Sequence, residues 1–213
     1  MSKLKLSIVR GTNANQVSQE YFVADSCETV LDALQYIYRY KDSTLSFRYD
    51  CRFKRCGLCG VSVDGRPVLA CTTQVKDGME IGPLPGLPVV RDLVVDRSFL
   101  DKLYQDLDLM IIPGAKNDEP PGCMVSSDYF HFAQCNECLV CATVCPAGQG
   151  EGKVFGPFVW VRLAQLHLDP RDRIDRIAQA ERLGVNGCAG CGKCHCASGI
   201  DFKKALGILK KDS

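Results

Sequence analysis

The cysteines of this chain limit its possible folds more than any other feature, because most of them fall into three closely spaced groups. The chain has 14 cysteines among 213 residues. The groups lie at 51–71, 135–145 and 188–196, and Cys27 and Cys123 lie outside them. Disulfide scaffolds are typically short secreted domains, whereas this chain is long and its N-terminus lacks a signal-peptide pattern. The spacings therefore favour metal binding over disulfides.

The first group has the spacing C-x4-C-x2-C followed by a more distant fourth cysteine. Its members are Cys51, Cys56, Cys59 and Cys71. This is the plant-type ferredoxin spacing for a [2Fe–2S] cluster, in which one loop supplies three thiolates and a neighbouring segment supplies the fourth. Gly57 and Gly60 leave room for backbone N–H groups to approach the sulfurs. A structural zinc site, which also uses C-x2-C pairs, is the alternative.

The second group reads C-x2-C-x2-C-x3-C-P, which is the bacterial ferredoxin pattern. Its members are Cys135, Cys138, Cys141 and Cys145, followed by Pro146. In this pattern the fourth cysteine binds the other of two clusters. The first three cysteines therefore need a distant fourth ligand, and Cys145 needs distant companions. The third group supplies candidates for both.

The first half of the chain has the pattern of a small α/β unit. The predicted elements are a strand over 3–10, a strand over 19–25, a helix over 27–41 and a hairpin over 60–75. Asp25 or Ser26 is the expected N-cap of the helix. The order strand, strand, helix and further strands is typical of a β-grasp fold.

The second half is predicted to be helical. The prolines concentrated within 81–92 indicate a stiff connector. The expected helices after it cover 98–111, 156–169 and 171–184. The predicted fold class is α+β, with an N-terminal β-grasp [2Fe–2S] ferredoxin domain over 1–97 and a C-terminal all-α ferredoxin-like domain over 98–213.

The chain resembles the iron–sulfur subunit of the succinate dehydrogenase and fumarate reductase family almost end to end. The three cysteine groups carry this resemblance, together with PLPGLPVVRDLVVD at 83–96 and FGPFVWVRLAQLHLDPRD at 155–172. The resemblance implies a subunit that passes electrons between an FAD-containing flavoprotein subunit and a second redox partner. The substrate chemistry belongs to the flavoprotein, so no catalytic residue is expected in this chain.

The third group departs from the family pattern in a way that affects its cofactor. The family usually has C-x5-C-x3-C-P here and a [3Fe–4S] middle cluster, whereas this chain places Cys191 between Cys188 and Cys194. We expect Cys145, Cys188, Cys191 and Cys194 to hold a [4Fe–4S] cluster. An unligated Cys191 beside a [3Fe–4S] cluster is the alternative.

Cys196 resembles the last ligand of the family pattern, although only His195 separates it from Cys194. A thiolate binds iron better than the nearby hydroxyl of Ser198. The predicted ligands of the other [4Fe–4S] cluster are Cys135, Cys138, Cys141 and Cys196. Cys27 and Cys123 are then left as thiols without a ligand role.

The quinone site that the family often carries has no match in this chain. The residues directly after Pro146, up to 153, include no aromatic side chain, and Ala189 rather than a histidine follows Cys188. Trp160 is expected to lie in a helix core instead. The second redox partner is therefore either a membrane anchor or a soluble low-potential protein.

Several classes of function are excluded or kept as rivals. A formal net charge of +1 gives no electrostatic case for a nucleic-acid partner. No apolar run is long enough to span a membrane, so we expect a cytoplasmic protein, either in solution or held peripherally at the cytoplasmic face through a partner. The rivals are the same role beside a flavoenzyme that acts on another C=C bond, and a free-standing ferredoxin-like carrier.

Overall fold

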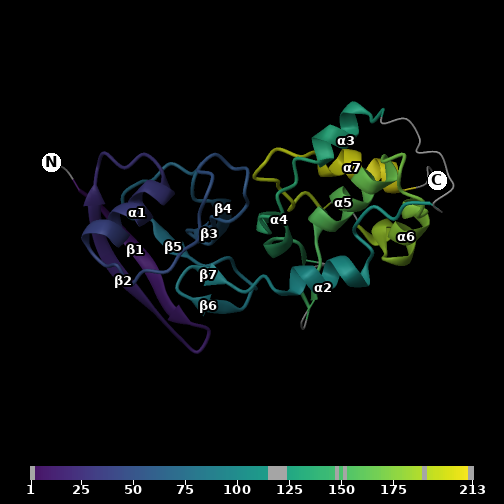
Figure 1. The fold of residues 1–213 in the computed structure, drawn as a ribbon. Helices are drawn as coiled ribbons and strands as arrows, with labels where there is room; N and C mark the ends of the chain where they lie inside the picture. The colour runs from purple at the N-terminus through teal and green to yellow at the C-terminus, as the bar shows by residue number, and fades with distance from the viewer. Residues whose placement is uncertain (1–2, 115–123, 147–148, 151–152, 189–190, 211–213) are drawn as a thin grey trace. The chain divides into compact units, whose positions relative to one another are not determined.

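The chain divides into two compact units in the computed structural model, which describes residues 3–114, 124–146, 149–150, 153–188 and 191–210 (Figure 1). Unit 1 comprises Met1–Asp96 and Asn136–Thr143, and unit 2 comprises Arg97–Cys135 and Val144–Ser213. The segment Asn136–Thr143, which carries two cysteines of the second group, thus folds with the N-terminal part of the chain. The predicted boundary between residues 97 and 98 stays a proposal.

Unit 1 is built on a five-stranded mixed sheet in the order β2-β1-β5-β3-β4. The strands are β1 (Lys3–Thr12), β2 (Asn15–Ala24), β3 (Gly60–Val63), β4 (Arg66–Leu69) and β5 (Glu80–Gly82). Leu6 and Ile8 of β1 are fully buried, as the alternation of apolar and polar residues predicts. The central β5 pairs in parallel with β1 and antiparallel with β3.

The position of β5 corrects the prediction of a connector over 81–92. Ile81 is fully buried in the middle of the sheet, so the start of that segment belongs to the core. A short hairpin of β6 (Val89–Arg91) and β7 (Val94–Val95) follows it. The prolines therefore lie between β5 and the β6–β7 hairpin and do not form a linker between domains.

Helix α1 (Val30–Tyr40) packs against the sheet with its apolar face buried. Its N-cap is Thr29, so the predicted caps at Asp25 and Ser26 are wrong. The Thr29 side chain accepts a hydrogen bond from the backbone of Asp32, and the Asp32 side chain accepts one from the backbone of Thr29. This capping box satisfies two backbone donors at once, which makes it a better cap than a single upstream side chain.

Unit 2 is helical apart from one short hairpin. Its helices are α2 (Phe99–Asp106), α3 (Ser127–Phe132), α5 (Pro157–His167), α6 (Arg176–Arg182) and α7 (Phe202–Leu209), and its hairpin joins β8 (Gln149–Gly150) to β9 (Lys153–Val154). Helix α5 is buried on nearly all sides and packs against α3, α6 and α7. Trp160 of α5 is buried against Phe155, as predicted. The mixed sheet and the helical unit confirm the α+β fold class.

The helix predicted over 98–111 ends at Asp106, because side chains from α6 bind the next backbone carbonyls. Arg176, which is fully buried, donates hydrogen bonds to the carbonyl oxygens of Asp108 and Met110. Gln179 donates to that of Leu107. These contacts take acceptors that a continuing helix would use, so tertiary structure overrides the helical periodicity.

In the described part of the chain, no helix is long and apolar enough to cross a membrane.

Candidate metal centres

The first cysteine group lies at one end of the β3–β4 hairpin. Cys59 directly precedes β3, and Cys71 follows β4 by two residues. The backbone N–H of Ala70 donates to the carbonyl oxygen of Cys59 at 2.9 Å, which holds the two ends of the hairpin together. Cys59 and Cys71 are buried, whereas Cys51 and Cys56 on the preceding loop are half-buried. The hairpin and the loop thus supply four thiols to one region.

The loop between Cys51 and Cys59 directs backbone N–H groups at the sulfur atoms. The Cys51 sulfur accepts hydrogen bonds from the N–H groups of Arg55 at 3.1 Å and Cys56 at 3.2 Å. The Cys71 sulfur accepts one from the N–H of Lys54 at 3.3 Å. The loop residues with a positive φ are Arg52 (65°), Lys54 (56°) and Gly57 (67°). Left-handed residues alternating with others turn successive N–H groups to one side, which forms an anion-binding concavity.

The pKa shifts in this region differ between the half-buried Cys51 and the buried Cys59. Burial raises the pKa of the Cys51 thiol, but three backbone N–H groups of the loop outweigh it and lower the pKa to about 7. Burial raises the pKa of the Cys59 thiol to about 12, and the charges of Cys71 and Cys56 act in the same direction. The thiols are therefore close enough to interact, and the N–H donors stabilise negative charge on Cys51.

The second cysteine group begins with a similar backbone pattern. Glu137 and Leu139 have positive φ values of 54° and 67°, one residue before and one residue after Cys138. Cys138 and Cys141 are buried, and Cys141 lies in the short helix α4 (Val140–Thr143). The grouping of Cys135, Cys138, Cys141 and Cys196 at one cluster stays a prediction.

Asn136 connects the second cysteine group to the loop of the first group. Its side-chain amide donates to the carbonyl oxygen of Lys54 at 2.6 Å, and its side-chain oxygen accepts from the N–H of Cys138 at 3.2 Å. Its own carbonyl oxygen lies so close to Gly57 that a Cβ built there would be 2.3 Å away. Gly57 is therefore required both for its positive φ and for this close approach.

Cys194 of the third group lies within electrostatic reach of Cys145, Cys188 and Cys191, and the assignment of these four thiols to one cluster stays a prediction. The pKa of the Cys194 thiol is raised to about 12, mainly by burial and further by the charges of Cys145, Cys191 and Cys188. A hydrogen bond with Cys145 adds to the shift. Three thiols close enough to act on Cys194 suit a shared metal cluster, since metal binding takes up thiols as thiolates.

Local structure positions both ends of the third group. Gly184 ends α6 with a φ of 87°, and the 3-10 turn Val185–Gly187 leads directly to Cys188. The Lys210 side chain donates to the carbonyl oxygen of Cys188 at 2.9 Å. Cys196 is half-buried, and the N–H of Gly199 donates to its carbonyl oxygen at 3.1 Å. Ala189 lies outside the described residues.

Cys27 is half-buried, and burial raises its pKa together with the charges of Asp32 and Asp25. Cys123 lies outside the described residues.

Within the described residues, no three Cys, His, Asp or Glu side chains converge as the ligands of a single ion would. A cluster distributes its protein ligands over several iron atoms, so its thiols surround a larger volume.

Sequence reasoning missed the backbone and side-chain groups that support the cysteines. Arg52, Lys54, Glu137 and Leu139 adopt left-handed conformations, for which their residue types carry no signal. The sequence did offer one indication of the role of Asn136: its side chain carries both a donor and an acceptor and lies between Cys135 and Cys138. Its partner at Lys54, 82 positions away, could not be read from spacing.

Comparisons with known proteins identify a 2Fe-2S domain and the family of the chain. A family model described as a 2Fe-2S iron–sulfur cluster binding domain matches residues 5–102. The fumarate reductase iron–sulfur subunit of Escherichia coli O157:H7 is 31% identical, and the match covers all of this chain and 94% of that protein. The corresponding subunit of Mycobacterium tuberculosis is 34% identical over 83% of this chain and 77% of that protein.

Other relatives are longer than this chain. A subunit of the CoM/CoB fumarate reductase of Methanothermobacter marburgensis is 34% identical over 78% of this chain but only 34% of its own length. An uncharacterized iron–sulfur protein of Methanocaldococcus jannaschii is 33% identical over 39% of its length. This chain thus spans little more than a third of those relatives. Among solved structures, the apo form of the Mycobacterium smegmatis Sdh1 complex contains a chain with a TM-score of 0.82 and 26% identity, and the match covers 97% of this chain and 93% of that one.

Proposed function

Because the chain belongs to the family of iron–sulfur subunits of fumarate reductases and succinate dehydrogenases, we propose that it relays electrons between an FAD-containing subunit and a second redox partner. The observation that carries the proposal is the loop of the first cysteine group. It gathers four thiols at one hairpin and directs N–H donors at two of their sulfurs. This loop lies within the segment that matches the 2Fe-2S domain.

The cysteines present fit three clusters. The proposed ligands of the [2Fe–2S] cluster are Cys51, Cys56, Cys59 and Cys71; those of the first [4Fe–4S] cluster are Cys135, Cys138, Cys141 and Cys196; those of the second [4Fe–4S] cluster are Cys145, Cys188, Cys191 and Cys194. The interactions among the thiols of the first and third groups support two of these sets.

When bound, such clusters supply one-electron transfer at potentials that depend on cluster type, charge and hydrogen bonding. The chain's own residues hold the thiolates at fixed positions and direct N–H groups at the sulfurs of Cys51 and Cys71. N–H donors stabilise the more negative state, so they raise the potential at that site. We assign the bond chemistry of the substrate to the FAD subunit and propose no catalytic residue for this chain.

A four-iron cluster at Cys145, Cys188, Cys191 and Cys194 distinguishes this proposal from the usual family pattern. Cys191 is the extra thiol, and it interacts electrostatically with Cys194 in the metal-free chain. We expect a [4Fe–4S] cluster at this position to have a lower potential than a [3Fe–4S] cluster. A lower potential suits a soluble low-potential donor better than a membrane quinone.

The substrate is proposed from the relatives, whose names specify fumarate reductases. We therefore propose that the FAD subunit reduces fumarate or oxidises succinate. The location, in the cytoplasm or held at the cytoplasmic face of the membrane through a partner subunit, is part of the same proposal.

Anaerobic purification of the native complex through an affinity tag on this chain tests the proposal. We expect a flavin-containing subunit in equimolar amount, fumarate reduction with a reduced viologen dye, and three EPR signals that appear only on reduction. A monomeric chain without flavin would overturn the proposal in favour of a free-standing carrier. A flavin subunit that reduces another C=C bond but not fumarate would overturn the proposed substrate alone.

A further inference from the structure

The second cysteine group packs directly on the loop of the first group. A Cβ built on Gly57 would lie 2.3 Å from the carbonyl oxygen of Asn136, and one built on Gly60 would lie 3.2 Å from that of Cys138. The segment Asn136–Thr143 folds as part of unit 1, together with the whole of that loop. The backbones that carry two different sets of proposed cluster ligands are therefore in contact.

A chain of amide groups runs between these two sets of ligands. The N–H of Arg55 donates to the Cys51 sulfur at 3.1 Å. The carbonyl oxygen of the same peptide unit, which belongs to Lys54, accepts from the Asn136 side-chain amide at 2.6 Å. The Asn136 side-chain oxygen in turn accepts from the N–H of Cys138 at 3.2 Å. Three hydrogen bonds and two planar amide groups thus lead from a sulfur of the proposed [2Fe–2S] site to a cysteine of the first proposed [4Fe–4S] site.

The partners of Asn136 determine how its side chain is oriented. A backbone N–H faces one end of the carboxamide, and a carbonyl oxygen faces the other. Only the amide oxygen can accept from Cys138 and only the NH2 group can donate to Lys54, so a flipped amide would lose both bonds. Aspartate could make the first bond but not the second, and leucine, which is of similar size, could make neither. The amide chain therefore depends on asparagine at this position.

Hydrogen bonds at the two ends of the Lys54–Arg55 peptide unit reinforce each other. Donation to the carbonyl oxygen polarises the peptide unit, which makes its N–H a stronger donor to the Cys51 sulfur. N–H donors to cluster sulfurs stabilise the more negative state. Asn136 thus acts on the proposed [2Fe–2S] site through the peptide unit that it binds.

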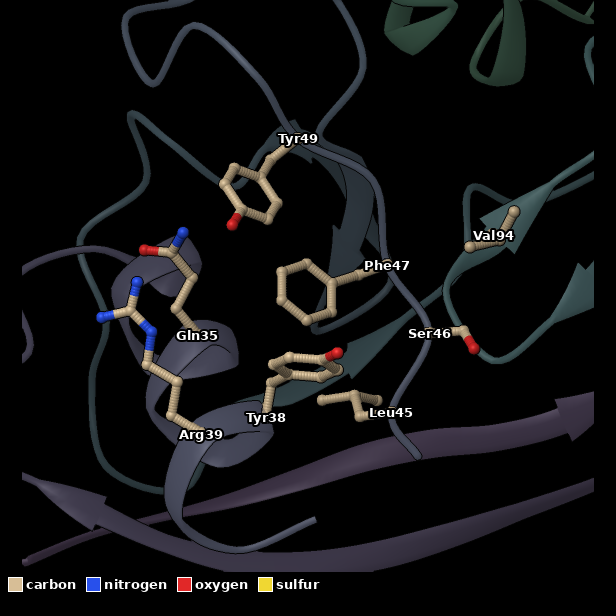
Figure 2. A pocket seen from close by; sticks show the side chains of 8 residues that line it. All are labelled: Gln35, Tyr38, Arg39, Leu45, Ser46, Phe47, Tyr49 and Val94. Carbon is tan, nitrogen blue, oxygen red and sulfur yellow. The ribbon is translucent and has the colours of Figure 1, made fainter. Parts of the chain in front are cut away.

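The loop that carries this peptide unit is anchored before and after its first cysteine. Before it, Phe47 stacks on Tyr49 with ring centroids 5.5 Å apart. Figure 2 shows both rings at a pocket of about 510 Å³, opposite Gln35 of α1. After it, the Arg52 side chain donates to the Gln35 side chain at 3.0 Å. Because both ends are held, the N–H groups of the loop stay directed at the sulfurs, and the amide chain is formed in advance.

Electrons pass more readily through covalent and hydrogen bonds than across a gap of the same length. We propose that Asn136 is a positioning residue for electron transfer, because the amide chain that it completes is the route between the [2Fe–2S] site and the first [4Fe–4S] site. One electron leaves the reduced site and enters the oxidised site, and no proton or covalent bond moves with it. This proposal rests on the proposed function and adds to it the route between two of its sites.

Matched substitutions test the route in the complete holoprotein. Asn136→Asp keeps the acceptor for Cys138 and removes the donor to Lys54, whereas Asn136→Leu removes both. Asn13→Asp and Asn13→Leu are the controls, because the Asn13 side chain also accepts from a backbone N–H in unit 1, that of Val89 at 2.8 Å, and lies in the turn between β1 and β2. Anaerobic pulse radiolysis adds a substoichiometric amount of electrons, and visible absorbance with freeze-quenched EPR follows their transfer between the two sites.

We expect Asn136→Leu to slow this transfer severalfold, Asn136→Asp to slow it less, and both Asn13 variants to transfer at the wild-type rate. Both Asn136 variants should also lower the potential of the [2Fe–2S] site in an EPR redox titration, because the Arg55 N–H becomes a weaker donor. Rates are therefore compared at the driving force that the measured potentials give. Asn136→Asp, which keeps the bond to Cys138, decides the outcome where Asn136→Leu loses iron.

Three results would overturn the proposal, and the first two would leave the proposed function intact. Wild-type rates in the Asn136 variants would show that the direct contact of Gly60 with Cys138 carries the electrons instead. Slower rates that the shifted potentials explain entirely would show that Asn136 tunes one site and is not on the route. If the wild-type holoprotein exchanges no electrons between the two sites, the proposed function fails and the route fails with it.

Discussion

Replacing Gly57 by alanine tests whether the loop of the first cysteine group is fixed by Asn136. Gly57 has a φ of 67°, and an added Cβ would lie 2.3 Å from the carbonyl oxygen of Asn136. Gly78 is the matched control, because its φ is 79° but nothing lies within 4 Å of a Cβ built there. Both substitutions impose the left-handed strain, and only Gly57→Ala adds a steric clash.

The two costs can be separated in magnitude. A left-handed alanine costs about 1–2 kcal/mol relative to glycine, and this applies to both variants. At Gly57 the carbonyl of Asn136 must also move from 2.3 Å to beyond 3.0 Å, although Asn136 is held by its hydrogen bonds to Lys54 and Cys138. Overpacking of this kind costs about 1–3 kcal/mol. We therefore expect Gly57→Ala to be destabilised by about 1–3 kcal/mol more than Gly78→Ala.

Anaerobic urea unfolding of the complete holoprotein, followed by far-UV circular dichroism and by visible cluster absorbance, measures this difference. Midpoints are compared because proteins with bound cofactors rarely unfold in two states. An extra cost of about 1–3 kcal/mol corresponds to a midpoint lower by roughly 1 M urea. Equal midpoints for the two variants would refute the close approach of Asn136 to this loop.

Three further experiments test the ligand role of Cys191, the pKa difference between Cys51 and Cys59, and the buried ion pair of Arg176. Cys191→Ala should give the oxidised complex a three-iron EPR signal that the wild type lacks; a strong signal in fresh wild-type protein would mean that Cys191 is not a ligand. In the cluster-free chain at about pH 8, iodoacetamide should label Cys51 before Cys59, because that pH is above the pKa of about 7 and far below the pKa of about 12; equal labelling by mass spectrometry would contradict this. Arg176→Met should destabilise the chain by about 3–5 kcal/mol, because it leaves a buried carboxylate unpaired, whereas exposed Arg182→Met should stay within about 0.5 kcal/mol in the same urea assay.

The cysteine spacing of the first group predicted a [2Fe–2S] domain, which the family model confirms, because cluster ligation is partly a local property. Three thiolates of the first group come from one loop, so their separation along the chain reflects the size of the cluster. The fourth, Cys71, follows a hairpin that its DG turn predicts, and the hairpin brings it back to Cys59. The family resemblance then supplied the partner and the order of domains.

Element ends and supporting contacts were not predictable in the same way. The helix after residue 98 has a regular apolar stripe up to Met110, yet it ends at Asp106 because Arg176 and Gln179 bind the carbonyls beyond it. Those two residues are distant from α2 in the sequence, so no local pattern reports them. The N-cap at Thr29 was missed although its partner Asp32 completes a capping box, a pattern that was present in the sequence.

The inclusion of Asn136–Thr143 in unit 1 bears on how the protein is made. During synthesis the strands of unit 1 leave the ribosome well before this segment does. Until it arrives, the carbonyl oxygen of Lys54 lacks its bond from Asn136, and the loop of the first cysteine group is incomplete. Insertion of the first cluster should therefore follow translation of the second cysteine group. A fragment that stops at residue 97 should acquire that cluster poorly, whatever its solubility.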